Sequence, residues 1–450
     1  MIYKDLAQPE QWSNVVIGEG CRSGPGLVLT VFKRIELGRH VEVGPYVSLS
    51  DSNHSCMPVN GPVLRKSPIQ PEGDGALRIG DRTRIGAHAV IAGNITIGQW
   101  SVIAAGSIVH SDVPDACIVA GNPARITAVY DPASSMWIRV HSQEEVEQVL
   151  SRRKEQPLLS ICIPTYNRMG HLEACLNSIF SQIGPTDLVE VIVSDNASTD
   201  GTEKVATRFL EQYPNMRYIR NPENIGADRN IIQAAGMARG IFLKLNGDDD
   251  YFLEEAVPLL LSTLHNHSDC SLVHTIPWRR DGGISRGNGA EAYLGTVSNH
   301  AVAMTLTTFR RADWEKITDR TAWGSTSLSQ VYWQYQILSH NPKFCTLGRN
   351  LYHYAGKAPD GYNFGKVAIR HYMQALSYFE GAGLSKEAIT TEMTKVLYGT
   401  LIPWYTRIVQ EKLGTDVSGF EDYYTECYRD QPYYEEVLLK IRAITALSRH

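Results

Sequence analysis

Three consecutive carboxylates, Asp248, Asp249 and Asp250, follow closely on an apolar run at residues 241–245. Adjacent carboxylates repel one another unless a cation lies between them. Oxygen ligands of this kind suit Mg²⁺ or Mn²⁺, so the cluster predicts a divalent metal ion that bridges a diphosphate. The alternative is a solvated acidic turn, because runs of charge are usually surface loops.

Three earlier apolar runs are also followed by polar clusters. Between them lie segments with apolar residues at helical spacing, such as residues 171–182. Alternating strands and helices form largely parallel sheets, which bind ligands at the carboxyl ends of their strands. The sequence therefore predicts one α/β unit with its polar clusters at one sheet edge. The clusters are 164–168, 194–202 and 221–230, and the runs before them are 158–163, 189–193 and 216–220.

The motifs IPTYNR, SDNASTDGT, NIGADRN and LNGDDD, in this order, resemble those of family 2 glycosyltransferases of the GT-A fold. The resemblance is strongest to members that build bacterial O-antigens and capsules. It implies transfer of a sugar, with inversion, from a nucleotide-sugar to a glycan acceptor that is lipid-linked.

The same resemblance implies roles for single residues. Asp248, Asp249 and Asp250 would form the Mn²⁺ or Mg²⁺ site, with Asp250 as the catalytic carboxylate. Gly247 stands at the first Asp of the family's usual Asp-x-Asp-Asp run. The nucleotide would be bound by Pro164, Thr165 and Tyr166 along the base, by Asp195 at the uracil or ribose, and by Arg229 near the base or phosphates.

The catalytic base of this family normally lies in a downstream Glu-Asp pair, where this chain has Ser325 and Thr326. An inverting displacement needs a carboxylate within hydrogen-bond reach of the acceptor hydroxyl. Asp313, Glu315 and Asp319 are the candidates, and the sequence does not rank them.

The first 130 residues contain aliphatic residues at intervals of six. This period fits neither a helix nor an alternating strand, and it predicts a parallel β-helix with triangular coils. Glycine directly follows several of the positions, at coil corners. The repeated positions are Val31, Leu37, Val43 and Leu49, and then Ile79, Ile85, Ile91, Ile97, Ile103 and Val109.

The repeat is interrupted between Asp51 and Ala76. The loop SDSNHS and the exit AAGSIVHSDVPDACIVAGNPARI resemble hexapeptide-repeat sugar O-acetyltransferases, which are left-handed β-helices. By this resemblance His54 is the general base that activates a sugar hydroxyl for attack on acetyl-CoA. The resemblance also implies a homotrimer, with Ala87 and Ala105 beside the pantetheine arm and Arg125 near the CoA phosphates.

Four regions are expected: the acetyltransferase-like domain at 1–130, a linker at 131–157, the GT-A domain at 158–350 and a helical extension at 351–450. In the linker, Ser142 and Glu145 form a capping box that opens a helix through Arg153. The extension is dense in tyrosine. These residues either stack on a sugar acceptor or a membrane face, or form helical core, and core is the favoured interpretation.

The 450 residues carry a formal net charge of -5, which offers no basic surface for nucleic acid. Eight scattered cysteines without a C-x-x-C spacing indicate free thiols in a reducing compartment. No apolar run approaches the length of a membrane span. We therefore expect a cytoplasmic protein, brought to the inner membrane face only by a lipid-linked acceptor.

The sequence leaves two other hypotheses about function open. In one, the β-helix has lost catalysis and is only a trimerisation scaffold for glycosyltransferase sites. In the other, the aspartate cluster is inert, and the α/β unit is a glycan-binding module that presents substrate to the acetyltransferase.

Overall fold

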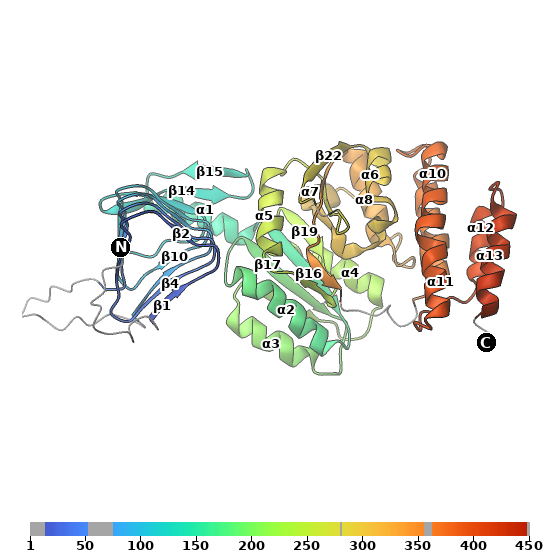
Figure 1. Cartoon of the computed structure of the whole chain (residues 1–450), viewed down its shortest axis with the longest axis horizontal. Helices are drawn as coiled ribbons and strands as arrows, with labels where there is room; N and C mark the ends of the chain where they lie inside the picture. The colour runs from blue at the N-terminus through green and yellow to red at the C-terminus, as the bar shows by residue number, and fades with distance from the viewer. Residues whose placement is uncertain (1–13, 53–74, 280, 355–361, 448–450) are drawn as a thin grey trace, which may run out of the picture. The chain divides into compact units, whose positions relative to one another are not determined.

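The chain divides into two compact units, Met1–Glu155 and Gln156–His450 (Figure 1). The computed structural model describes residues 14–52, 75–279, 281–354 and 362–447. Within these ranges, no helix combines the length and the apolar character that crossing a membrane requires. All the cysteines in these ranges are free thiols, as expected, and Cys56 lies outside them.

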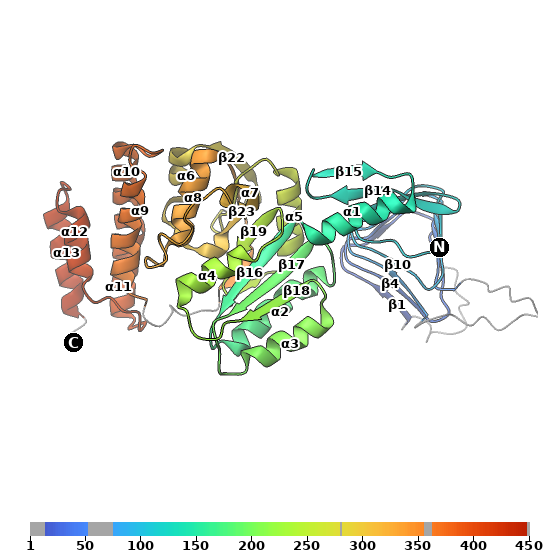
Figure 2. The ribbon, with the colours of Figure 1, turned by 180° about the vertical axis from the view of Figure 1, so that it is seen from behind.

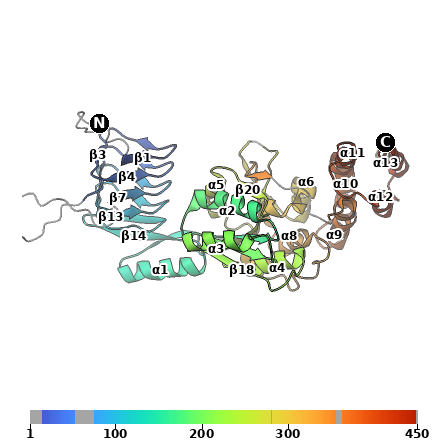
Figure 3. The ribbon, with the colours of Figure 1, turned by 90° about the horizontal axis from the view of Figure 1, so that it is seen from below.

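The first unit is a parallel β-helix whose short strands form three sheets. Successive coils stack so that each strand pairs in parallel with the strand one coil later (Figure 3). The first sheet has the order β1 (Val15–Ile17), β4 (Arg34–Leu37), β7 (Ala76–Ile79), β10 (Thr96–Ile97); the second begins β2 (Arg22–Ser23), β5 (Glu42–Val43), β8 (Arg84–Ile85), β11 (Val102–Ile103), β13 (Cys117–Gly121); the third is β3 (Val28–Thr30), β6 (Ser48–Ser50), β9 (Val90–Ala92), β12 (Ile108–Val109).

The six-residue period explains this arrangement. Every repeated aliphatic side chain named above is buried inside the coils, except Val31, which is half-buried. Glycine is required at coil corners because the next coil passes against it. A Cβ at Gly86 would lie 2.4 Å from the backbone nitrogen of Ala105, and one at Gly80 would lie 2.5 Å from that of Gln99.

Residues 131–157 are the expected linker, and residues 131–155 of this range belong to the first compact unit. Strands β14 (Ala124–Asp131) and β15 (Met136–Arg139) extend the second sheet in antiparallel fashion. The helix predicted from the capping box is α1 (Gln143–Glu155), and Ser142 Oγ accepts the Glu145 N–H at 3.2 Å. Val146 and Val149 of α1 are buried in the β-helix core. The helix therefore packs on the first unit through an apolar face. This face was not predicted because most residues of the helix are polar or charged.

The second unit is built on one mixed sheet with the strand order β18-β17-β16-β19-β23-β21-β24-β22. Its first four strands are parallel, as predicted, and β23 is antiparallel to both neighbours. The strands are β16 (Leu159–Thr165), β17 (Val189–Asp195), β18 (Met216–Arg220), β19 (Phe242–Leu245), β21 (Leu272–Thr275), β22 (Ile284–Asn288), β23 (Thr307–Arg310) and β24 (Lys343–Leu347); β20 (Asp250–Phe252) pairs separately with β25 (Tyr352–Tyr354).

Helices connect these strands and cover the sheet (Figure 2). Because β16 to β18 advance in one direction, right-handed crossovers put α2 and α3 on one face, and the return to β19 puts α4 on the other. Helices α2 and α3 pack together, and α4 packs on β16 and β17. The helices up to β24 are α2 (Met169–Ile183), α3 (Thr202–Gln212), α4 (Ala227–Gly236), α5 (Ala256–Asn266), α6 (Ala290–Val297), α7 (Arg311–Trp314) and α8 (Ser329–His340), with two short 3₁₀ turns at Ser298–Val302 and Met304–Leu306.

The C-terminal region is helical, as expected. It shares one hydrophobic core with the sheet, because Tyr335 of α8 packs on Phe379 with ring centroids 5.4 Å apart. Tyr372, Tyr424 and Tyr428 are fully buried, as the core interpretation expects, whereas Tyr378 and Tyr398 are 52% and 44% exposed. The helices are α9 (Tyr372–Tyr378), α10 (Lys386–Val396), α11 (Ile402–Gln410), α12 (Phe420–Tyr428) and α13 (Tyr434–Leu447), with π-helical segments at Lys366–His371 and Leu397–Leu401.

Candidate functional site

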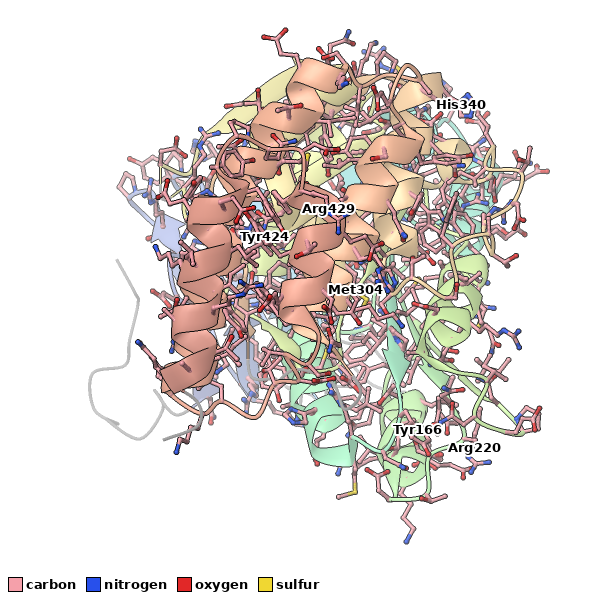
Figure 4. All side chains as sticks on the ribbon, turned by 90° about the vertical axis from the view of Figure 1, so that its right-hand side faces the viewer. Tyr166, Arg220, Met304, His340, Tyr424 and Arg429 are labelled. Carbon is pink, nitrogen blue, oxygen red and sulfur yellow. The ribbon has the colours of Figure 1, made fainter. Side chains whose placement is uncertain are left out.

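The predicted polar clusters meet at the carboxyl edge of the parallel strands. Thr165 pairs with Asp195, and Asp195 with Arg220, so the ends of β16, β17 and β18 are aligned. Figure 4 labels Tyr166, which follows β16, and Arg220, which ends β18, in the same lower part of the view. Strand β19 ends beside β16, which brings the following aspartates to the same place.

Asp248 is the most buried of the three aspartates, with 4% of its surface exposed. Thr165 Oγ1 donates to its Oδ2 at 2.7 Å, and Arg168 Nη1 donates to its Oδ1 at 3.1 Å. Burial raises the pKa of Asp248 to about 6, although these hydrogen bonds oppose the shift. The carboxylate is therefore held in a fixed position by residues of the IPTYNR motif.

Asp249 and Asp250 converge over Gly247. A Cβ at Gly247 would lie 2.9 Å from Asp249 Oδ1 and 2.8 Å from Asp250 Oδ2. The missing side chain thus leaves room for two carboxylate oxygens to approach the same point, which suits a hard divalent cation. Among the described residues, no three His, Cys, Asp or Glu side chains are grouped to hold a metal ion. A metal held here would need further oxygen ligands from a diphosphate.

Besides Thr165, one positive group and a second hydroxyl contact the aspartates, and neither had a role predicted from the sequence. Arg168 Nη1 also contacts Asp249 Oδ2 at 2.7 Å. Thr305 Oγ1 donates to Asp250 Oδ2 and accepts the Gly247 N–H at 3.0 Å. Arg168 was recognisable as the last residue of IPTYNR, whereas nothing in the sequence near Thr305 indicates a role.

Lys244 is a fully buried lysine in β19, and its ammonium donates to the Thr305 carbonyl. Burial lowers the pKa of Lys244 to about 7, opposed by the negative charge of Asp250. The sequence could have indicated Lys244 as a functional candidate, because a lysine inside an apolar strand is unusual.

Asp195 is completely buried at the end of β17. Its Oδ1 accepts the Ser198 N–H at 2.8 Å, and its Oδ2 accepts the Tyr218 hydroxyl at 2.8 Å. Burial, followed by the hydrogen bond to Asp195, raises the pKa of Tyr218. Among the other predicted nucleotide contacts, Tyr166 is 44% exposed, Arg229 is exposed and Pro164 is half-buried.

The candidate bases Asp313 and Glu315 lie at the opposite edge of the sheet. Strand β23 is antiparallel to β19 and pairs Arg310 with Phe242, the first residue of β19. Asp313 is bound by Lys316 at 2.9 Å and by Asn341 at 2.8 Å, and Glu315 pairs with Arg311.

Asp319, the third candidate, is tied to its own loop, because its Oδ1 accepts both the N–H and the hydroxyl of Thr321. The structure therefore supports none of the three as the base.

In the first unit, Ala87 and Ala105 occupy equivalent corners of neighbouring coils, and the Gly106 N–H donates to the Ala87 carbonyl at 2.8 Å. Arg125 of β14 pairs with Ala120, near the C-terminal end of β13 in the next coil. Its side chain is exposed. His54 lies outside the described residues. Asp51, three positions before His54, is buried and accepts backbone N–H groups of Phe32, Lys33 and Arg34 at 2.8, 2.6 and 2.6 Å.

Comparison with known proteins assigns each unit a different relationship. The sequence profile of Glycosyl transferase family 2 matches residues 160–332, and that of Bacterial transferase hexapeptide (six repeats) matches residues 77–111. The chain therefore joins a hexapeptide-repeat region to a region related to family 2 glycosyltransferases.

Two relatives agree with this division. The abequosyltransferase RfbV of Salmonella typhimurium is 39% identical over 116 residues, which are 26% of this chain and 35% of the relative. The galactoside O-acetyltransferase of Escherichia coli is 33% identical over 114 residues, which are 25% of this chain and 53% of the relative. The chain thus spans about a third and about half of their lengths. The crystal structure of S. aureus TarS 1-349 aligns with 64% of this chain and 87% of its own, at 15% identity and a TM-score of 0.46.

Proposed function

We propose that the second unit transfers a sugar, with inversion and with the aid of a divalent metal, from a nucleotide-sugar to a glycan acceptor of bacterial surface polysaccharide synthesis. The observation that carries the proposal is the meeting of Thr165, Asp195 and Asp248–Asp250 at one sheet edge. Ligands of open α/β sheets bind at this edge.

The residues at this edge suggest a division of labour. Asp249 and Asp250 would hold Mn²⁺ or Mg²⁺, which when bound neutralises the charge that develops on the diphosphate leaving group. Asp248 is bound by Thr165 and Arg168 and would position the other two. Pro164, Thr165, Tyr166, Asp195 and Arg229 would bind the nucleotide.

We propose further that the first unit transfers acetyl from acetyl-CoA to a sugar hydroxyl of the same glycan. His54 would take the hydroxyl proton as the oxygen attacks the thioester carbonyl. Ala87 and Ala105 would border the pantetheine arm of CoA, and Arg125 would contact its phosphates. The exposed corner that Ala105 and Arg125 share supports this assignment.

The proposal extends to the assembly and the location of the protein. We propose a homotrimer through the β-helix, a cytoplasmic protein, and a lipid-linked acceptor that recruits it to the inner membrane face. Two activities on one chain raise the effective concentration of one product at the other site.

An assay with both donors tests the proposed function. The intact protein receives acetyl-CoA, a panel of nucleotide-sugars, Mn²⁺ and a glycan acceptor extract, beside His54→Ala and Asp250→Ala variants. His141→Ala is the control for the first variant, because His141 is exposed and contributes a backbone N–H to Glu145. We expect His54→Ala to lose only acetyl transfer and Asp250→Ala to lose only sugar transfer.

Two results would contradict parts of the proposal. If the unaltered protein transfers sugar but releases no CoA with any acceptor, the β-helix is a scaffold. Equal donor turnover by Asp250→Ala and the unaltered protein would make the α/β unit a glycan-binding module.

A further inference from the structure

The segment Trp323–Ser327 packs against the first turn of α4 at the carboxyl edge of the sheet. Asp228 Oδ2 accepts the Ser327 N–H at 3.2 Å. A Cβ at Gly324 would lie 3.9 Å from the Asp228 Cβ and 3.6 Å from Ile232 Cδ1. The first turn of α4 follows β18. Asp228 therefore lies at the same edge of the sheet as the aspartate cluster.

The other carboxylates that follow β17 and β18 are less suited to accept a proton. Asp195 uses both of its oxygens in hydrogen bonds. Asp200 accepts hydrogen bonds from Thr202 and from the Met169 N–H. Glu203 and Glu223 are exposed to solvent.

Asp228 differs from these groups. It is half-buried, and within the described ranges its single hydrogen bond is made by Oδ2, so Oδ1 is available. Burial raises the pKa of Asp228, opposed by the Ser327 N–H. A higher pKa makes the carboxylate a stronger proton acceptor.

We propose that Asp228 is the general base of the sugar transfer. Its Oδ1 takes the proton from the acceptor hydroxyl while that oxygen forms a bond to the anomeric carbon. The bond between this carbon and the diphosphate oxygen breaks, and its electron pair leaves with the nucleoside diphosphate. The inference rests on the proposed function of the second unit.

The segment that contacts Asp228 also carries Trp323, which belongs to an aromatic cluster. Trp323 stacks on Tyr332 with ring centroids 3.8 Å apart. Tyr378, which is 52% exposed, packs edge-on against Trp323 with ring centroids 4.8 Å apart. An exposed aromatic ring can pack against the apolar face of a sugar. His371 Nδ1 donates to the Thr326 carbonyl at 2.5 Å, so the C-terminal helical region helps to hold this segment in place.

The test uses the full-length protein and the nucleotide-sugar and acceptor that it turns over. Asp228→Asn keeps an oxygen that can accept the Ser327 N–H but removes the basic carboxylate. We expect kcat to fall by about 10²-fold or more, with the donor KM changed by less than about twofold. The kcat of the unaltered protein should fall as the pH drops below the pKa of Asp228, and this acid limb should be absent from the variant.

Asp319→Asn is the matched control, because it replaces an Asp that is tied to its own loop, and it should leave kcat unchanged. Asp228→Glu should recover part of the rate. A rise in donor KM at unchanged kcat would make Asp228 a donor contact and overturn the proposal, as would an Asp228→Asn variant with full activity. If the unaltered protein transfers no sugar from any donor, the proposed function itself fails, and the inference fails with it.

Discussion

Thr165 and Asp248, separated by 83 positions in the sequence, are joined by a hydrogen bond of 2.7 Å between Oγ1 and Oδ2. The bond links the end of β16 to the turn that follows β19. Both residues are buried, so the bond is shielded from solvent. It fixes the first aspartate of the cluster relative to the IPTYNR motif.

Replacing Thr165 by Val should remove this bond and leave a buried carboxylate oxygen without its donor. Such losses cost about 1–3 kcal/mol of unfolding free energy, and more when the group is charged. We expect a lower unfolding midpoint in guanidinium and a loss of sugar transfer. Thr165→Ser keeps the hydroxyl and should retain most of both. Equal stability of Thr165→Val and the unaltered protein would show that the bond does not contribute.

Gly247 offers a more local test of the aspartate pair. A methyl group at this position would meet the carboxylate oxygens of Asp249 and Asp250 at less than 3 Å and push them apart. Gly247→Ala should therefore weaken Mn²⁺ binding, measured by calorimetry with the nucleoside diphosphate, by about tenfold or more, which corresponds to about 1.4 kcal/mol.

Gly236→Ala is the matched control for Gly247→Ala. Gly236 ends α4, and a Cβ there meets no atom within 4 Å. This variant should bind Mn²⁺ normally and be equally or slightly more stable, because alanine favours a helix. Unchanged Mn²⁺ binding by Gly247→Ala would exclude Asp249 and Asp250 as a joint metal site.

The sequence was sufficient to predict that the polar clusters after β16, β17 and β19 meet at one edge of the sheet. Polar clusters after apolar runs are informative because parallel strands end at a common edge, and Thr165, Asp195 and Asp248 lie there as predicted. The six-residue period was equally informative about the β-helix, because each flat face of a coil is formed by one six-residue repeat.

Partners from distant parts of the chain could not be predicted. Thr305 reaches Asp250 from a 3₁₀ turn 55 positions away, and no local pattern indicates this contact. Asp313 and Glu315 failed as base candidates because β23 runs antiparallel to β19, which carries the following residues to the opposite edge. Strand direction depends on the whole sheet and not on the residues beside the motif.

Asp51 should be essential to the first unit. Its carboxylate accepts three backbone N–H groups, from Phe32, Lys33 and Arg34, and it is 1% exposed. Hydrogen bonds to a buried charged group contribute about 1.5–3 kcal/mol each. Asp51→Ala should expose the Phe32–Arg34 turn to hydrogen exchange and abolish acetyl transfer.

Sugar transfer by Asp51→Ala should persist, since the second unit has its own core. Asp112→Ala is a suitable control, because Asp112 accepts one N–H, from Thr96, at an exposed position. Unchanged exchange at the Phe32–Arg34 turn in Asp51→Ala would contradict the assigned role of the carboxylate.

His274 should make the second unit sensitive to acid. The side chain is fully buried in β21, and its Nδ1 lies 2.9 Å from Thr307 Oγ1. Burial lowers the pKa of His274 to about 3, assisted by the positive charges of His300 and Lys244. The unfolded chain binds this proton below about pH 6.5, whereas the folded protein excludes it until about pH 3.

Between these two values the unfolded state binds more protons, so stability falls as the pH falls, by about 1.4 kcal/mol per unit from this group. Guanidinium unfolding of the unaltered protein at pH 7, 6 and 5 should show this slope, added to those of other groups. His274→Asn keeps a polar atom near the Nδ1 position and removes the titration. Its slope should be smaller by about that amount, and parallel pH profiles for the two proteins would show that His274 is not the group responsible.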